Sequence, residues 1–354
     1  MALWAVAATL ASPTERFYTV WNWQEPFHGE KVMPYDWDWG PDLLEGYESK
    51  FVRMEDAFDG PVRCTIIRKL CAKPSRKAFL YVHGFNDYFF QREFGERMVD
   101  SGVNFYAVDL RRYGRSRLPW QYPFNVRRQH EFFEDIDSAL AQIRRDGCTD
   151  ITLGGHSTGG LTVSYYAAMR GRLIGVDRVV TDSPFLEWNF SPFMRDVAAN
   201  LIEGFAHITP DAKIKQDHCD GYAYSLLRQY DGEWEYNTDW KMIYSPPVTM
   251  SWVGAVNHAQ RQLLKRGRFI TVPFLLMTSS RAIKGCDYTP EFSTGDCVLD
   301  PPMIRKRGAR LAFDSLRVEC VVDSGLHDLI LSRKAVRDRA YDAIFRFMNL
   351  EHPA

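Results

Sequence analysis

Residues 150–160, Asp-Ile-Thr-Leu-Gly-Gly-His-Ser-Thr-Gly-Gly, decide the fold that we predict for this chain. They place a Gly-x-Ser-x-Gly motif between a short apolar run and a segment with helical spacing of apolar residues. A serine at such a sharp strand-to-helix turn has a strained backbone and an exposed Oγ, and the flanking glycines let strand and helix approach each other. Free N–H groups at the start of the helix favour an oxyanion. We therefore interpret Ser157 as a nucleophile rather than as an incidental serine in a glycine-rich loop.

Outward from this motif, strands and helices alternate along the chain. Such alternation predicts a mostly parallel sheet with helices on both faces, which is an α/β fold. We expect eight strands, the first two of which form a hairpin. The strands are expected at residues 51–57, 62–70, 78–83, 103–109, 150–156, 178–182, 271–278 and 316–322, and the clearest helices at 90–101, 127–146 and 332–347.

Residues 186–268 interrupt the alternation with a helical, aromatic stretch dotted with prolines. An insertion at the carboxyl end of a strand in such a sheet lies above the crevice where ligands bind. We interpret it as a helical cap inserted after the sixth strand. The predicted organisation is then an aromatic-rich extension at 1–60, a core at 61–185 and 269–354, and the cap at 186–268. We expect one residue of the core and four of the cap to contact substrate: His83, Trp188, Phe190, Tyr222 and Trp252.

A serine hydroxyl needs a base, and the base needs an acid that orients it. In this type of sheet the order along the chain is serine, acid, histidine. His327 fits the order, because it lies in the loop between the last strand and the last helix. The acid is expected after the strand that ends near residue 278, and we choose Asp296. Three aspartates remain as alternatives: Asp182, Asp287 and Asp300.

A His-Gly turn closes the strand at residues 78–83 and brings a backbone N–H towards the serine. We predict that the N–H groups of Phe85 and Thr158 form the oxyanion hole. His83 itself is also expected to be a structural turn residue. The charged turn at residues 109–116 is expected to form a supporting ion-pair network rather than an anion site.

Composition excludes some classes of protein. The formal net charge is −1, which does not suggest nucleic-acid binding. Seven cysteines without a Cys-x-x-Cys pair favour reduced thiols, although Cys286 and Cys297 flank one loop and could be bridged. No apolar run is long enough for a membrane span. We expect a cytoplasmic protein; export is the alternative if residues 1–11 are the remnant of a signal peptide.

Several motifs together resemble the α/β-hydrolase superfamily, in its monoacylglycerol lipase, lysophospholipase and serine aminopeptidase-like branch. They are His83-Gly84-Phe85, Asp109 to Ser116, Gly155 to Gly159, Asp182-Ser183-Pro184, Asp296 to Asp300 and His327-Asp328. Two departures are a long loop before Asp296 and a first 60 residues without a counterpart.

The resemblance implies two-step ester hydrolysis without cofactor or metal. The aromatic cap suggests an apolar acyl chain, as in a monoglyceride or lysophospholipid, with transient contact with a lipid surface. Two other functions remain open. One is a peptidase, in which Glu187, Glu203 and Glu233 are candidates to hold a substrate amine, and the other is a ligand-binding module without catalysis. The oligomeric state is not predicted.

Overall fold

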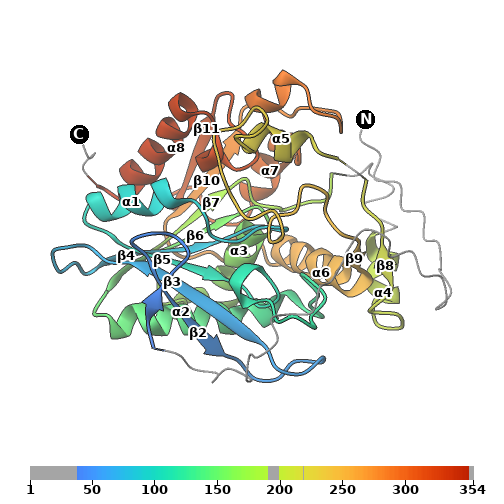
Figure 1. Cartoon of the computed structure of the whole chain (residues 1–354), viewed down its shortest axis with the longest axis horizontal. Helices are drawn as coiled ribbons and strands as arrows, with labels where there is room; N and C mark the ends of the chain where they lie inside the picture. Colours follow the sequence, from blue (N-terminus) through green and yellow to red (C-terminus); the bar gives the residue numbers. More distant parts are fainter. Residues whose placement is uncertain (1–37, 190–198, 218, 351–354) are drawn as a thin grey trace.

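The computed structural model describes residues 38–189, 199–217 and 219–350 (Figure 1). Its centre is a nine-stranded sheet with the strand order β1-β2-β3-β5-β4-β6-β7-β10-β11. The strands are β1 (Gly40–Pro41), β2 (Glu48–Arg53), β3 (Arg63–Lys69), β4 (Lys77–Val82), β5 (Asn104–Asp109), β6 (Asp150–His156), β7 (Arg178–Asp182), β10 (Phe274–Ser279) and β11 (Arg317–Val322).

The sheet is mostly parallel, as predicted. All neighbours from β5 to β11 in the strand order pair in parallel, whereas β1, β2 and β3 add an antiparallel edge. The sheet has one strand more than the eight predicted, because the two-residue β1 pairs with β2. The sequence does not predict β1, because two residues are too few to show the alternation of apolar and polar residues that marks a strand.

Helices cover both faces of the sheet (Figure 1). On one face, α1 (Arg92–Asp100) and α8 (Lys334–Phe347) share a core cluster with the sheet through Phe94, Tyr341 and Phe345. On the other face, α2 (Phe132–Arg145) and α3 (Thr158–Arg170) pack through residues such as Ile136 and Leu161. The predicted helices therefore take their places because each presents an apolar stripe to the sheet. A further helix, α7 (Pro301–Gly308), packs beside β10.

The stretch at residues 186–268 leaves the sheet after β7 and returns to it at β10. Its described part contains α4 (Ala199–Phe205), α5 (Gly221–Leu226), α6 (Met250–Arg266) and a small antiparallel sheet of β8 (Lys213–Ile214) and β9 (Val248–Thr249). If β1 is left aside, β7 is the sixth strand, where the insertion was predicted. That this insertion serves as a cap stays a prediction. Within the described ranges, no helix is long and apolar enough to cross a membrane.

The predicted boundary at residue 60 does not coincide with the edge of the sheet. Strands β1 and β2 lie before it, so the sheet begins inside the segment that we assigned to the extension. Asp42 also forms an ion pair with Arg115 of the core. Of the tryptophans in that segment, Trp39 packs against the Arg68 guanidinium at 3.7 Å. The remaining four, Trp4, Trp21, Trp23 and Trp37, lie outside the described residues.

Candidate active site

Ser157 occupies the turn between β6 and α3 in a backbone conformation that few residues adopt. Its φ is 52° and its ψ is −115°. The glycine spacing has a visible cause: a Cβ on Gly159 would lie 2.3 Å from the carbonyl oxygens of both Val82 and His83, and one on Gly155 would lie 2.5 Å from the carbonyl oxygen of Gly159. Only glycine therefore permits this close approach of strand and helix.

Ser157, His327 and Asp296 form a continuous chain of hydrogen bonds. The Ser157 Oγ lies 2.9 Å from His327 Nε2, and His327 Nδ1 lies 3.0 Å from Asp296 Oδ2. All three side chains are buried. With Nδ1 donating its proton to the carboxylate, Nε2 is left to accept the serine proton, which is the arrangement that activates a serine.

The backbone around Asp296 holds its carboxylate in place. Asp296 Oδ1 accepts the N–H groups of Val298 and Leu299, both at 2.8 Å, which leaves Oδ2 for the histidine. The long loop before Asp296 folds back on itself, with Ile283 N donating to Asp296 O at 2.7 Å and Asp296 N donating to Arg281 O at 3.0 Å. The length of this loop therefore does not displace the acid.

The three alternative aspartates do not reach His327. Asp182 accepts hydrogen bonds from Leu329 N at 2.9 Å and from the Ser183 hydroxyl at 3.1 Å. Burial, and then the charge of Asp328, raise the pKa of Asp182 well above its usual value. Asp287 is exposed, and Asp300 precedes the first turn of α7. Of the four candidates, the structure brings Asp296 alone to the histidine.

The predicted oxyanion residues flank the nucleophile. Thr158 is the first residue of α3, so its N–H is one of the groups that the helix leaves without an internal partner. The turn that carries Phe85 lies against the turn that carries Ser157, because a Cβ on Gly84 would come within 3.1 Å of the Ser157 Cβ. Both N–H groups thus belong to backbone segments beside Ser157.

His83 holds the turn together through both ring nitrogens. Nδ1 donates to Gly84 O at 2.8 Å, and Nε2 accepts the N–H of Leu110 at 3.0 Å. This pattern requires the neutral imidazole, and burial lowers the pKa of His83 accordingly. Since both nitrogens are occupied by backbone groups, the structure supports the turn role and not the predicted substrate contact.

Three of the predicted aromatic contacts lie near the site. The Trp252 ring of α6 packs on Phe85 with ring centres 4.6 Å apart, and Trp188 lies 6.3 Å from Trp252. Tyr222 of α5 faces His327 at 5.8 Å. Phe190 lies outside the described residues. The insertion thus contributes one aromatic ring next to the Phe85 turn and one next to the catalytic histidine.

A second set of buried polar side chains lies next to His327, through the His156 ring at 4.8 Å. In the part of the chain that the structure describes, Asp87, His156 and Asp328 are the side chains whose grouping resembles a metal site, with their ligand atoms within 4.8 Å of one another. However, the Lys241 Nζ already lies 3.1 Å from Asp87 Oδ1. Burial opposes a proton on His156, but Asp328, Asp87 and Asp182 together raise its pKa to about 9. A protonated imidazole cannot bind a metal, so we interpret these four residues as a charge-balanced cluster.

Sequence reasoning missed this cluster. His156 and Asp328 each adjoin a predicted catalytic residue, and we assigned neither a role. Lys241 comes from the insertion, 154 positions from Asp87. This pair could be predicted only from the path of the insertion in space, and local patterns in a single sequence do not give that path.

The cysteine pairing differs from the bridge that we considered. Cys219 and Cys286 form the disulfide, and Cys297 is free. We considered Cys297 as the partner of Cys286 because the two cysteines flank one loop. In the structure, this loop places Cys286 against the insertion, where Gly221 N donates to Cys286 O at 3.1 Å. The expectation of reduced thiols throughout is therefore wrong for this pair.

The chain matches the model of the serine aminopeptidase S33 family, Hydrolase_4, over residues 73–282, which is more than half of its length. The chain belongs to this family. The family match covers β4 to β10, and therefore Ser157 and the whole insertion. The prediction of a serine hydrolase of the α/β-hydrolase type is thus confirmed.

Solved structures agree with this fold. A monoacylglycerol lipase from Paleococcus ferrophilus is 20% identical with a TM-score of 0.58, over 80% of this chain and 98% of that one. A soluble variant of the Saccharomyces cerevisiae monoglyceride lipase, in complex with a substrate analogue, is 13% identical with a TM-score of 0.62, over 84% and 95%. A thermophilic esterase from Thermogutta terrifontis is 16% identical with a TM-score of 0.53, over 84% and 98%. At these identities the likeness concerns the fold alone. No curated protein sequence matches the chain.

Proposed function

We propose that the chain hydrolyses carboxylic esters with Ser157 as nucleophile, His327 as base and Asp296 as the residue that orients His327. The observation that carries this proposal is the continuous hydrogen-bond chain from Ser157 Oγ through His327 to Asp296, at 2.9 and 3.0 Å. No metal or cofactor enters the proposed reaction.

In the first step, the Ser157 Oγ attacks the ester carbonyl carbon while His327 Nε2 takes the hydroxyl proton. The negative charge that forms on the carbonyl oxygen is stabilised by the N–H groups of Phe85 and Thr158, each contributing about 3 to 4 kcal/mol in sites of this kind. The tetrahedral intermediate then breaks its bond to the alcohol oxygen, which leaves with the proton of His327. Water repeats the sequence on the acyl-enzyme and releases the acid.

The substrate class that we propose is an ester with a medium or long apolar acyl chain, such as a monoglyceride or lysophospholipid. The support is the aromatic rings of the insertion near the nucleophile, namely Trp188, Tyr222 and Trp252. Aromatic side chains bind apolar groups with little loss of conformational entropy. The two lipases with a similar fold act on monoacylglycerols by their names, which agrees with this choice.

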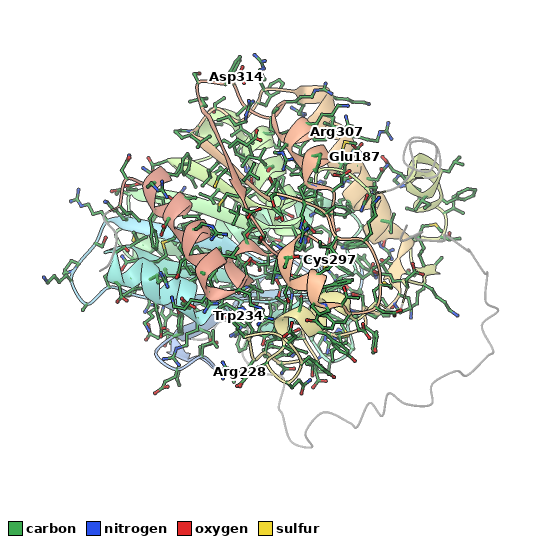
Figure 2. The ribbon with its side chains drawn as sticks, turned by 90° about the horizontal axis from the view of Figure 1, so that it is seen from above. Glu187, Arg228, Trp234, Cys297, Arg307 and Asp314 are labelled. Carbon is green, nitrogen blue, oxygen red and sulfur yellow. A yellow bond between two sulfur atoms is a disulfide. The ribbon has the colours of Figure 1, made fainter. Side chains whose placement is uncertain are left out.

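An aminopeptidase needs a carboxylate that binds the substrate amine, and the three candidates are already paired. Glu187 binds Arg307, Glu233 binds Arg337, and Glu203 accepts from Asn257, His258 and Arg261. Figure 2 shows the labelled side chains of Glu187 and Arg307 close together. A substrate amine would have to displace an arginine at each position. We therefore favour esters over peptides.

The test is turnover of p-nitrophenyl esters from acetyl to dodecanoyl, alongside aminoacyl arylamides, after labelling with a fluorophosphonate probe. We expect labelling of Ser157, higher kcat/KM for octanoyl than for acetyl esters, and no arylamide turnover. A strict preference for the acetyl ester would overturn the lipid substrate, and efficient arylamide turnover would favour the peptidase. Folded protein that does not label would overturn the catalytic assignment and favour a ligand-binding module.

A further inference from the structure

Residues 241–245 of the insertion lie against the turn that carries the predicted oxyanion donor. Asn86 Nδ2 donates to Met242 O at 2.7 Å, and Met242 N donates to Asn86 Oδ1 at 2.8 Å. Asn86 Nδ2 also lies 3.2 Å from the Ser245 hydroxyl. The side-chain amide of Asn86 therefore pairs with the Met242 backbone in the way that one strand pairs with another.

The backbone of Asn86 also depends on its residue type. Its φ is 50°, in the left-handed region that asparagine tolerates better than most residues. Asn86 directly follows Phe85, so a change in its backbone angles rotates the peptide next to the oxyanion donor. The same residue thus satisfies the turn conformation and binds the insertion.

An ion pair holds the next residue of the turn. Lys241 Nζ lies 3.1 Å from Asp87 Oδ1, with the Lys241 side chain 7% exposed and that of Asp87 fully buried. Burial by itself would raise the pKa of Asp87, but the Lys241 ammonium and His156 hold it below its usual value. Asp87 is therefore ionised and depends on Lys241, because a buried carboxylate without its partner is costly.

We propose that Asn86 and Lys241 are positioning residues for catalysis: through them, residues 241–245 of the insertion fix the turn so that the Phe85 N–H stays aimed at the developing oxyanion. This inference rests on the proposed function, since it concerns the oxyanion hole of that reaction. Neither residue touches the reacting atoms. The Phe85 ring is held by the same insertion, through Trp252 at 4.6 Å. Fixed donors stabilise a transition state more than a bound substrate, so their displacement lowers kcat rather than raising KM.

The experiment compares wild type with Asn86→Ala, Lys241→Arg and Tyr122→Phe in hydrolysis of p-nitrophenyl butyrate. Tyr122→Phe is the matched control, because its hydroxyl donates to Pro247 O at 2.6 Å and so also links the core to this part of the insertion, but through no residue of the turn at 83–87. We expect Asn86→Ala to lower kcat about 10- to 100-fold with KM nearly constant. Inhibition by a phenylboronic acid, whose adduct occupies the oxyanion hole, should weaken in parallel. Lys241→Arg keeps the charge, so it should retain most of the activity, and Tyr122→Phe should change kcat less than about twofold.

The outcomes separate this inference from the function on which it depends. Normal kcat and boronate inhibition in Asn86→Ala would overturn the inference alone, as would a rise in KM without a fall in kcat. An equal fall in Tyr122→Phe would also overturn it, because any link to the insertion would then suffice. If Asn86→Ala does not fold, Asn86→Asp decides, because aspartate tolerates the same φ but lacks the amide N–H that donates to Met242 O. A lowered kcat at constant KM with weaker boronate inhibition is then expected, and a normal kcat with unchanged boronate inhibition would contradict the proposal. Failure of wild type to label with fluorophosphonate would instead reject the proposed function.

Discussion

Two histidines lie side by side next to the nucleophile, and each has at least one carboxylate nearby, yet their surroundings differ. The rings of His156 and His327 are 4.8 Å apart. His327 lies within 3.0 Å of its partners Ser157 and Asp296. His156 Nδ1 lies 3.6 Å from Asp328 and 3.8 Å from Asp87, beyond hydrogen-bond distance. The first arrangement can pass a proton, whereas the second can only balance charge. Residue types alone do not distinguish them.

The largest effect is expected from removal of the nucleophile. Ser157→Ala should lower kcat by about 10⁶-fold, because the acyl-enzyme cannot form. The measurement is hydrolysis of p-nitrophenyl octanoate, with intact mass after fluorophosphonate treatment. Ser138→Ala, a change on α2 whose hydroxyl lies 3.8 Å from the Met54 sulfur, is the control and should label normally. Labelling that persists in Ser157→Ala would place the nucleophile elsewhere.

A second pair of variants compares the carboxylate beside His327, Asp296, with one beside His156, Asp328. Asp296→Asn should lower kcat by about 10⁴-fold, because the amide favours the wrong tautomer of His327. Asp328→Asn alters the carboxylate beside His156 and should cost less than about 100-fold, since Asp328 makes no hydrogen bond with the His327 ring in the described structure. The measurement is kcat of both variants from steady-state kinetics. Equal losses would mean that the two carboxylates share one function.

Removal of Lys241, one of the two cations of the charge-balanced cluster, should affect stability. Lys241→Met leaves Asp87 charged and buried without its ammonium partner, which should lower the free energy of unfolding by about 3 to 5 kcal/mol. Urea denaturation followed by tryptophan fluorescence measures the change. The double variant Lys241→Met with Asp87→Leu removes both charges and should recover much of the loss. A single variant as stable as wild type would contradict the charge balance.

The smallest effect concerns pH. Because the folded state raises the pKa of His156 to about 9, the bound proton contributes stability that is complete below the unfolded pKa of about 6.5 and is lost as the pH rises through about 9. We therefore expect the stability difference between wild type and His156→Gln to shrink from pH 6 to pH 10. Urea midpoints at intervals of one pH unit test this. A constant difference would mean that His156 is not protonated in the folded protein.

The sequence predicted the parts of the site that local patterns encode. The bounds of β6 and β7 agree with prediction, and the Gly-x-Ser-x-Gly spacing follows from the contact between Gly159 and the end of β4. His327 and Asp296 were placed by their order along the chain. Contacts made by the insertion could not be predicted, since the Asn86 pairing with Met242 and the Lys241 pairing with Asp87 depend on its path in space. The partner of Cys286 was missed for the same reason.

The disulfide between Cys219 and Cys286 closes a covalent ring that contains α5, α6 and β10. A protease that cuts the backbone once inside this ring would leave two fragments still joined. Such a nicked chain would migrate near full length on a non-reducing gel and separate into two bands only after reduction. The chain thus tolerates one break in most of its insertion without losing a piece.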